Sequence, residues 1–408
     1  VSNPKGIYKC FSSGKGGNVI SFIMEHEHFT YPEAIKHLCN AFGIEFLETE
    51  RSNEEKIIEQ QKESLMIISK IASEYFKKNL HPTIDQPHSA LQYLRIDRQM
   101  STEIMDKFEI GFAPATLSGL TNHLINNGYN WEMAVSASVL GYHQPKNRLY
   151  DRFRNRIMFP IKNISGNIIG FGGRALVPDD KNPKYLNSSD SIIYNKSEVL
   201  YGIFESKKAI IESNKAFLSE GYTDVISWHQ REMCNIVASC GTSFTKEHAQ
   251  IIKRFTKNVT VMFDGDAAGH RAAIRGIDIL LAEGMNVRVL ILPDGQDPDD
   301  FAKANSKEQM LEYIALNEKD FVMFKLNFLL ELAGDDISLK SNAVQEVVSS
   351  IAKIPDQIKQ EVYLRECARL MNMNIEILRQ SLKVYSKEVQ DFDVVNIDNF
   401  QQQAIHSK

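Results

Sequence analysis

Hydrophobic and polar positions alternate in short runs through the centre of this chain, and each run stops at glycines or charged residues. The run VTVMF at 259–263 is too short and too rich in β-branched residues for a helix, so it predicts a buried strand. Similar runs predict strands at 215–218, 235–238 and 287–292. The segments between them have helical spacing, and strands that alternate with helices in this way predict a parallel sheet with right-handed crossovers.

Helical periodicity dominates both sides of this region. Toward the N-terminus, helices are expected at 19–28, 31–42 and 58–80 and from 101 onward, with strands at 151–161 and 168–173. Beyond 301, apolar residues recur three and four positions apart, which predicts mutually packed helices at 310–316, 320–333, 339–352 and 356–371. The expected fold class is mixed α/β, with an N-terminal α+β part, a central parallel sheet and a C-terminal helical part.

Acidic side chains follow the predicted strands. Because the carboxyl ends of parallel strands meet at one edge of a sheet, we expect five carboxylates to converge there: Glu220, Asp264, Asp266, Asp297 and Asp299. Carboxylates held together favour a hard divalent cation, Mg²⁺ or Mn²⁺, between them. An Asp-Gly pair after a strand is also ordinary turn chemistry, and Asp224 could either assist the metal site or cap the following helix.

Basic residues gather just before this acidic edge. From 146 to 215 there are 13 Lys and Arg against 7 Asp and Glu, although the whole chain has a net charge of −5. Within 151–161, Arg152, Arg154 and Arg156 alternate with other residues, so in a strand they would share one face and meet a polyanion. The alternative is a solvated strand edge guarded by charge. Gly172 and Gly173 are expected to form a turn that lets Arg174 approach a phosphate.

Composition excludes two classes of protein. At 408 residues and 43% hydrophobic content, the chain can form two or three domains with real cores. No apolar run approaches the roughly 20 residues of a membrane-spanning helix, so we expect a cytoplasmic protein with no membrane partner. The five cysteines are odd in number, scattered and without a CxxC pair, which argues against a disulfide-stabilised secreted domain.

The order of the acidic motifs resembles the Toprim module that bacterial DNA primases, topoisomerases and some nucleases share. Those motifs are SEGYTD at 219–224, FDGDAAG at 263–269 and LPDGQDPDD at 292–300. The flanking segments DRFRNRIMFPI at 151–161, GFGGR at 170–174 and PKYLNS at 183–188 resemble the polymerase core of the bacterial replicative primases, the DnaG family. The similarity extends from about residue 5 to about residue 382.

This resemblance implies template-directed synthesis of short RNA primers from NTPs on single-stranded DNA. Two divalent ions would bind Glu220, Asp264 and Asp266, with Asp297 and Asp299 holding or shaping a second position, and Glu220 could also accept a proton. The template and nucleotide path would include Arg98, Arg174, Lys184 and Lys196, although Arg98 could equally be a surface arginine after a helix. Implied partners are the replicative helicase and single-stranded DNA-binding protein, both members of the primosome.

The resemblance also divides the chain. Residues 1–47 resemble part of a zinc ribbon, but Ser13 stands where the family has a second cysteine, and Cys10 alone cannot hold structural zinc, which we expect only in a complete parent protein. After a linker at 48–56, the N-terminal α+β part of the core would span 57–205, the Toprim part 206–302 and a helical part without chemistry 303–385. A polar tail at 386–408 would be disordered, and the helicase-binding region would lie outside this chain.

Two other functions remain open. A Toprim protein could be a nuclease or a topoisomerase-like strand cleaver, for which Tyr222 lies close to Glu220 in sequence but has the place of a helix-start aromatic. The chain could also be a catalytically idle fragment that binds DNA or the helicase. Covalent trapping on DNA would identify a cleaver, and a lack of metal binding at the acidic edge would identify an idle fragment.

Overall fold

The computed structural model describes residues 1–2, 6–12, 16–27, 29, 31–44, 53–80, 89–176, 183–241, 243–263, 277–293 and 295–386. These residues divide into two compact units, Val1–Ile67 and Ile68–Lys408. Asp264, Asp266, Ser13 and the tail from 387 lie outside the described residues, so the expectations that concern them are not tested by the fold. None of the described helices is long and apolar enough to cross a membrane.

The first unit is a small hairpin followed by helices. Strands β1 (Ile7–Lys9) and β2 (Gly16–Asn18) pair antiparallel, and α1 (Val19–Glu27) and α2 (Tyr31–Phe42) follow. The helix α3 (Asn53–Leu80) begins in this unit and continues into the second. It is five residues longer at its start than its periodicity predicted, so 53–56 of the expected linker are helical, while 48–52 lie outside the described residues.

An antiparallel sheet opens the second unit. Its order is β3–β6–β7–β8, formed by Gly111–Ala113, Arg156–Lys162, Ile168–Ala175 and Tyr185–Asn187. The helix α3 lies directly on β3, because a Cβ on Gly111 would come within 2.6 Å of the backbone of Phe76. Around the sheet lie these shorter elements: α4 (Ser89–Gln92), the π-helical turn η2 (Tyr93–Asp97), α5 (Thr102–Lys107), α6 (Gly119–Asn126), α7 (Trp131–Ser136) and the hairpin β4–β5 (Leu140–His143, Arg148–Asp151).

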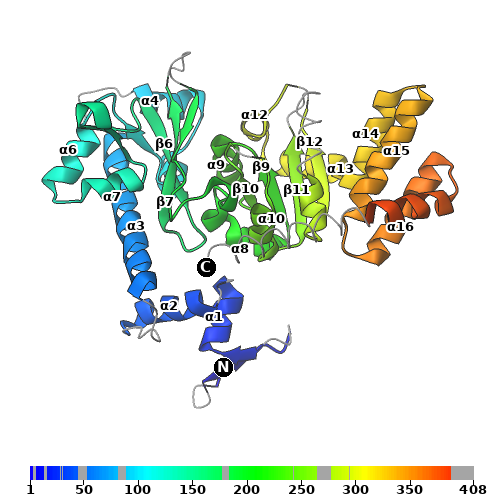
Figure 1. The fold of residues 1–408 in the computed structure, drawn as a ribbon, viewed down its shortest axis with the longest axis horizontal. Helices are drawn as coiled ribbons and strands as arrows, with labels where there is room; N and C mark the ends of the chain where they lie inside the picture. Colours follow the sequence, from blue (N-terminus) through cyan, green and yellow to red (C-terminus); the bar gives the residue numbers. More distant parts are fainter. Residues whose placement is uncertain are drawn as a thin grey trace. The chain divides into compact units, whose positions relative to one another are not determined.

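The central sheet has the order β10–β9–β11–β12–β13 (Figure 1). Strands β9 (Ala216–Ser219), β10 (Ile236–Ala238), β11 (Asn258–Phe263) and β12 (Asn286–Ile291) are parallel, which confirms the four predicted strands and their parallel arrangement. The two-residue β13 (Lys319–Asp320) closes one edge antiparallel. Helix α8 (Ile203–Ser213) precedes β9, while α9 (Tyr222–Gln230) connects β9 to β10 and α10 (Lys246–Lys253) connects β10 to β11. Residues 277–282, before β12, are also helical.

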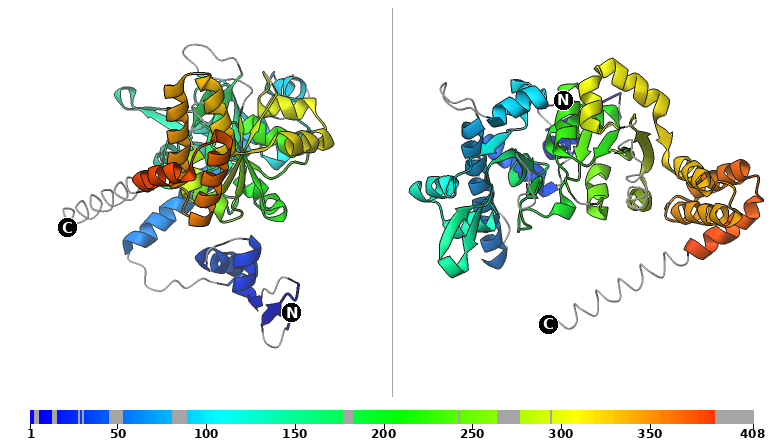
Figure 2. Two further views of the ribbon diagram at one scale, coloured as in Figure 1. Left: turned by 90° about the vertical axis from the view of Figure 1, so that its right-hand side faces the viewer. Right: turned by 90° about the horizontal axis from the view of Figure 1, so that it is seen from above.

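The C-terminal helices match their predicted positions closely. After α12 (Pro298–Ala304) come α13 (Lys307–Asn317), α14 (Phe321–Ala333), α15 (Ile337–Ala352) and α16 (Gln357–Met371). Figure 2 shows α14, α15 and α16, in orange, packed side by side. Their buried faces join the apolar cluster of the central sheet, so Ile351 and Leu364 share one core with Val287 and Val289 of β12. The predicted mixed α/β fold class is confirmed.

Candidate active site

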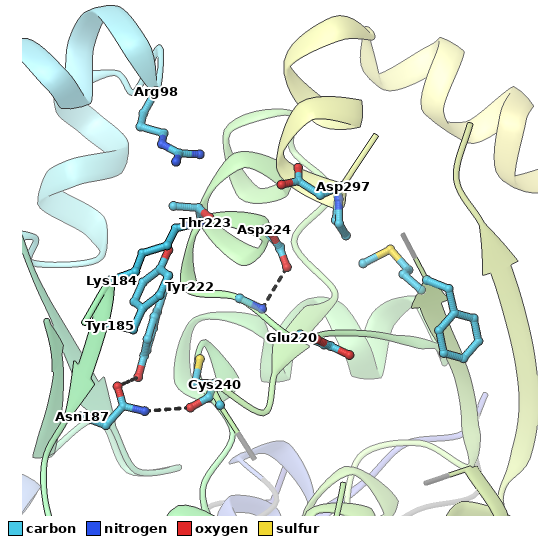
Figure 3. Close-up of a pocket in the computed structure, with 15 residues that line it drawn as sticks. Arg98, Lys184, Tyr185, Asn187, Glu220, Tyr222, Thr223, Asp224, Cys240 and Asp297 are labelled. Atoms are coloured by element: carbon cyan, nitrogen blue, oxygen red, sulfur yellow. Dashed lines mark hydrogen bonds between the residues drawn. The ribbon is translucent and has the colours of Figure 1, made fainter. Parts of the chain in front are cut away.

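A pocket of about 380 Å³ lies at the carboxyl ends of β9 and β11 (Figure 3). Glu220 directly follows β9, and Phe263 is the last residue of β11; both line the pocket. The two strands are neighbours, with Val261 paired to Leu218, which places Phe263 at the level of Glu220. Of the five carboxylates expected to converge, Glu220 and Asp297 line this pocket, whereas Asp299 does not. Asp264 and Asp266 lie outside the described residues, so the full convergence stays a prediction.

The first turn of α9 forms the floor beside Glu220. The Asp224 carboxylate accepts a hydrogen bond from the backbone N–H of Gly221 at 2.9 Å and so caps the helix. Capping is one of the two roles that the sequence analysis left open for Asp224. The Tyr222 ring stacks on Phe159 with centroids 5.1 Å apart, and its hydroxyl donates to the Asn187 side chain at 2.9 Å. Tyr222 is 3% exposed, and burial raises its pKa well above the ordinary value. A buried neutral phenol is a poor nucleophile for DNA.

The two predicted metal ligands after β12, Asp297 and Asp299, lie in different environments. Asp297 lines the pocket and caps α12, since its carboxylate accepts the Asp300 backbone N–H at 2.7 Å. Asp299 is fully buried away from the pocket lining, and its carboxylate pairs with Arg98 and Lys303 and accepts the hydroxyl of Ser227. Together with Asp300, these two form a group of acidic residues whose oxygens lie within 4.8 Å of one another.

Arg98, which directly follows η2 near the antiparallel sheet, reaches the pocket from outside the central sheet. Its Nε donates to the Tyr93 hydroxyl and its Nη1 to Asp299. Burial lowers the pKa of Arg98, but the Tyr93 hydrogen bond and the Asp299 charge outweigh burial, so the net shift is upward. The Arg174 guanidinium lies over the Tyr93 ring, 4.6 Å from its centroid. Both arginines therefore contact the same tyrosine ring, and their role on the phosphate path stays a prediction.

The expected turn at Gly172 and Gly173 is wrong, because β7 continues through both glycines to Ala175. The reason for a glycine at 172 is close packing: a Cβ there would lie 2.3 Å from the Tyr222 ring. Arg174 therefore projects from a strand, is 9% exposed and has an Nε without a hydrogen-bond partner among the described residues.

The expected shared face of three arginines is also wrong. Strand β5 ends at Asp151 and β6 begins at Arg156, and between them Asn155 has φ of 51°, which turns the chain. Arg154 is exposed, whereas Arg156 is buried and donates to the carbonyls of Gly173 and Pro183 at 3.0 and 2.9 Å, and burial lowers its pKa. Half-buried Arg152 donates to the Asn187 carbonyl at 3.2 Å.

The two lysines expected on the nucleotide path separate. Lys184 is exposed and lines the pocket, with its Nζ 5.9 Å from the ring centroid of Tyr185. Lys196 does not line the pocket; its backbone carbonyl contacts His248 at 3.1 Å, and its N–H donates to Asp190. Of the seven cations predicted from sequence, Arg98 and Lys184 line the pocket.

The sequence analysis did not assign two residues of this region: Asn187, which lines the pocket, and Tyr93, which does not line it but contacts Arg98 and Arg174. Asn187 accepts from Tyr222 and donates to the Cys240 carbonyl at 2.9 Å, which ties β8 to the loop after β10. Tyr93, under both arginines, has no signal in its sequence neighbourhood. Asn187 lies in the segment PKYLNS, so the resemblance could have pointed to it.

The zinc expectation concerns the first unit. Cys10 contacts Ser12 at 3.1 Å. Within the described part of 1–54, no three His, Cys, Asp or Glu side chains approach one another closely enough to share an ion. The described residues therefore do not fit a structural zinc, which takes four Cys or His ligands.

Four protein-family models match consecutive parts of the chain. A CHC2 zinc finger matches residues 1–54, the N-terminal domain of the DNA primase catalytic core matches 75–207, and a Toprim-like model matches 217–302. The zinc finger and Toprim models imply zinc and a divalent metal, respectively. The DnaB-helicase binding domain of primase matches 323–376. That last match corrects the expectation that a helicase-binding region lies outside this chain.

Curated relatives and solved structures agree with these matches. The chain is 35% identical over 396 residues to a DNA primase of Listeria monocytogenes, covering 96% of the chain and 63% of the relative, and 35% identical over 385 residues to one of Halalkalibacterium halodurans, at 93% and 63% coverage. It therefore spans about 63% of the length of these relatives.

Two solved structures align with most of the chain. A DNA primase domain from Pseudomonas aeruginosa has 30% identity and a TM-score of 0.71, with 78% of this chain and 99% of that chain covered. The Aquifex aeolicus primase, with its zinc-binding and RNA polymerase domains, has 30% identity and a TM-score of 0.67, with 93% and 88% covered. By sequence and by fold, this chain belongs to the DnaG family of bacterial DNA primases.

Proposed function

We propose that this chain synthesises short RNA primers from NTPs on a single-stranded DNA template. The observation that supports this most is the pocket: Glu220 and the end of β11 meet Arg98 and Lys184 at the carboxyl edge of a parallel sheet. Carboxylates that hold a metal beside cations that hold phosphates are the parts that nucleotidyl transfer needs. A similar solved structure, at 32% identity and a TM-score of 0.67, is a DnaG primase catalytic domain bound to single-stranded DNA.

The metal-binding residues in this proposal are Glu220, Asp264 and Asp266, with Asp297 beside them. Glu220 is exposed to the pocket, and its carboxylate oxygens are hard ligands of the kind that Mg²⁺ or Mn²⁺ prefers. Two bound ions would supply the charge that activates a ribose 3′-hydroxyl and stabilises leaving pyrophosphate. The number of ions is part of the proposal.

The chain's own cations would orient the phosphates. Arg98 and Lys184 would contact the triphosphate from the side opposite Glu220, while Arg174 supports Arg98 through Tyr93. Exposed Arg154 would add long-range attraction for the template.

The proposed macromolecular partners are the replicative helicase and single-stranded DNA-binding protein, in the cytoplasm. The helicase would dock on α14–α16, the helices that match the helicase-binding model. The strand-cleaver alternative loses support because Tyr222 is buried and hydrogen-bonded to Asn187. The idle-fragment alternative remains and predicts no metal-dependent chemistry.

The proposal is tested by comparing the rate of primer synthesis of the Glu220→Gln variant with that of the wild-type chain. Glutamine keeps the size of the side chain and removes its charge, so we expect at least about a 100-fold loss of primer synthesis on single-stranded DNA with NTPs and Mg²⁺. Asp264→Asn and Asp266→Asn should behave alike. Glu212→Gln is the matched control, since Glu212 is 66% exposed on α8, outside the pocket, and should keep wild-type activity.

Three outcomes would count against the proposal. Full activity of Glu220→Gln would remove the metal assignment, and an inactive wild-type chain that still binds DNA would favour the idle fragment. Denaturation-resistant attachment of the wild-type protein to DNA, absent in Tyr222→Phe, would favour the strand cleaver.

A further inference from the structure

We infer that Asp299 is a positioning residue: it holds the Arg98 guanidinium against the pocket, where that guanidinium binds a phosphate group, and it does not ligate metal. This inference rests on the proposed function, in which phosphates of a nucleotide or of the template enter the pocket. It separates Asp299 from its motif neighbour Asp297, which lines the pocket.

The contacts of Asp299 leave little capacity for an ion. The side chain is 0% exposed, Oδ1 accepts the Ser227 hydroxyl, and Oδ2 meets both Arg98 Nη1 and Lys303 Nζ, the latter at 3.1 Å. Mg²⁺ dehydrates reluctantly and keeps several waters when it binds protein. A hydrated ion could reach Asp299 only by displacing one of two cations that already neutralise it, and this displacement is costly at a buried site.

The backbone that carries Asp299 is fixed to α9. The Trp228 indole N–H donates to the Pro298 carbonyl at 3.0 Å, and Arg231 donates to the carbonyls of Ala302 and Lys303 at 2.8 and 2.9 Å. Since α9 begins two residues after Glu220, Asp299 has a fixed position relative to the proposed metal site. Whatever Asp299 holds is therefore placed relative to Glu220.

Asp299 holds an arginine that lies 201 positions away in the sequence. Arg98 uses Nε for Tyr93 and Nη1 for Asp299, and its side chain keeps 17% exposure. Figure 3 shows the guanidinium pointing across the pocket toward Thr223 and Asp297. A guanidinium has five donors in a planar fork, so its second amino group remains for a phosphate oxygen. Pairing on one side orients the fork and lowers the entropy lost when it binds.

Three variants of the 408-residue chain test the inference: Asp299→Asn, Arg98→Gln and the double variant. The readouts are the KM for NTP and kcat in primer synthesis, the Kd for MgATP, the Kd for a single-stranded oligonucleotide, and the affinity for Mn²⁺ by calorimetry. We expect each single variant to weaken the binding of one phosphate ligand about tenfold, as loss of a charge-assisted hydrogen bond predicts. The double variant should be no worse, with Mn²⁺ affinity unchanged in all three.

The two Kd measurements show whether Arg98 binds a phosphate of the nucleotide or a phosphate of the template. A change confined to MgATP assigns Arg98 to the nucleotide, and a change confined to the oligonucleotide assigns it to the template. Glu312→Gln is the control, because Glu312 is an exposed acidic residue on α13 outside the pocket, and its substitution should leave every value within about twofold.

Several results would overturn the inference: weaker Mn²⁺ binding by Asp299→Asn, a defect that adds to that of Arg98→Gln, or unchanged phosphate binding in both single variants. Removing one partner of a buried pair destabilises a protein, so the double variant, which removes both charges, decides the metal question if the single variants do not fold. Because MgATP and Mn²⁺ binding need no turnover, a wild-type chain that makes no primer would refute the proposed function and still allow this test.

Discussion

The Tyr222 hydroxyl donates a 2.9 Å hydrogen bond to the side-chain oxygen of Asn187. This bond joins α9, which packs on the central sheet, to β8 of the antiparallel sheet. Tyr222 opens α9 beside Glu220, while Asn187 ends β8. The wall of the pocket therefore depends on the position of the buried Tyr222 ring, and Gly172 on β7 packs directly against this ring.

Gly172→Ala should push this ring out of place. The added Cβ would lie 2.3 Å from Tyr222 Cζ, and the ring cannot retreat because Phe159 stacks against it. Overpacking of this kind costs about 1–3 kcal/mol, and we expect weaker MgATP binding as the Asn187 bond breaks. Urea denaturation and MgATP titration measure both effects. Tyr222→Phe, which removes the bond without a clash, should lose only about 1 kcal/mol; equal losses in both variants would contradict the steric account.

The limits of sequence analysis follow from particular residues. Strands such as 259–263 were predictable because their apolar pattern is local, and so were α13–α16. The alternation in DRFRNR fits a strand equally well, and only the burial of Phe153 and the positive φ of Asn155 make it a turn. The pairing of Asp299 with Arg98 was not predictable, because the two residues lie 201 positions apart and no spacing rule reveals such a pair.

Asp151→Asn should destabilise the second unit. Its buried carboxylate accepts the backbone N–H groups of Leu120 and Thr121, each at 2.9 Å, and the Thr121 hydroxyl at 2.7 Å, so it caps the start of α6 from a strand. An amide has only one acceptor oxygen for three donors. We expect a loss of about 1–3 kcal/mol in the free energy of unfolding, measured in urea.

The control for that measurement is Asp335→Asn. Asp335 is exposed and lies 3.9 Å from Lys340, so its substitution should change the free energy of unfolding by less than about 0.5 kcal/mol. If Asp151→Asn were as stable as this control, the three contacts would contribute nothing to the fold.

Lys325→Met should loosen the helices that match the helicase-binding model. Buried Lys325 donates to the Ser350 hydroxyl at 2.9 Å, and Ser350 donates at 2.7 Å to Asp278 in the helix at 277–282. This chain of bonds joins α14 and α15 to the helix at 277–282, which precedes β12 of the central sheet. Methionine fills the space and removes the donor, so we expect a loss of about 1–3 kcal/mol and faster hydrogen exchange in α14–α15. Lys340→Met, at a 41% exposed lysine, should leave the exchange unchanged.

His229 should make stability depend on acidic pH. Burial, and then the Lys107 ammonium 2.9 Å from Nδ1, lower the pKa of His229 to about 3 in the folded chain. An unfolded histidine titrates near 6.5, so below that pH the unfolded chain binds a proton that the folded chain refuses. The contribution of neutral His229 is complete above pH 6.5 and is lost as pH falls toward 3, by at most about 1.4 kcal/mol per pH unit.

Urea unfolding from pH 7.5 to 4.5 measures this dependence against His229→Gln, which keeps a polar side chain of similar reach without the titration. Wild type should be the more stable at pH 7.5, because Ser206 and Lys107 both contact the neutral ring at 2.9 Å, and its advantage should shrink steadily on acidification. His143→Gln, at an exposed histidine, should follow the wild-type curve. A constant gap between wild type and His229→Gln would mean that His229 gains its proton in the folded chain as readily as in the unfolded one, so that burial does not control its charge.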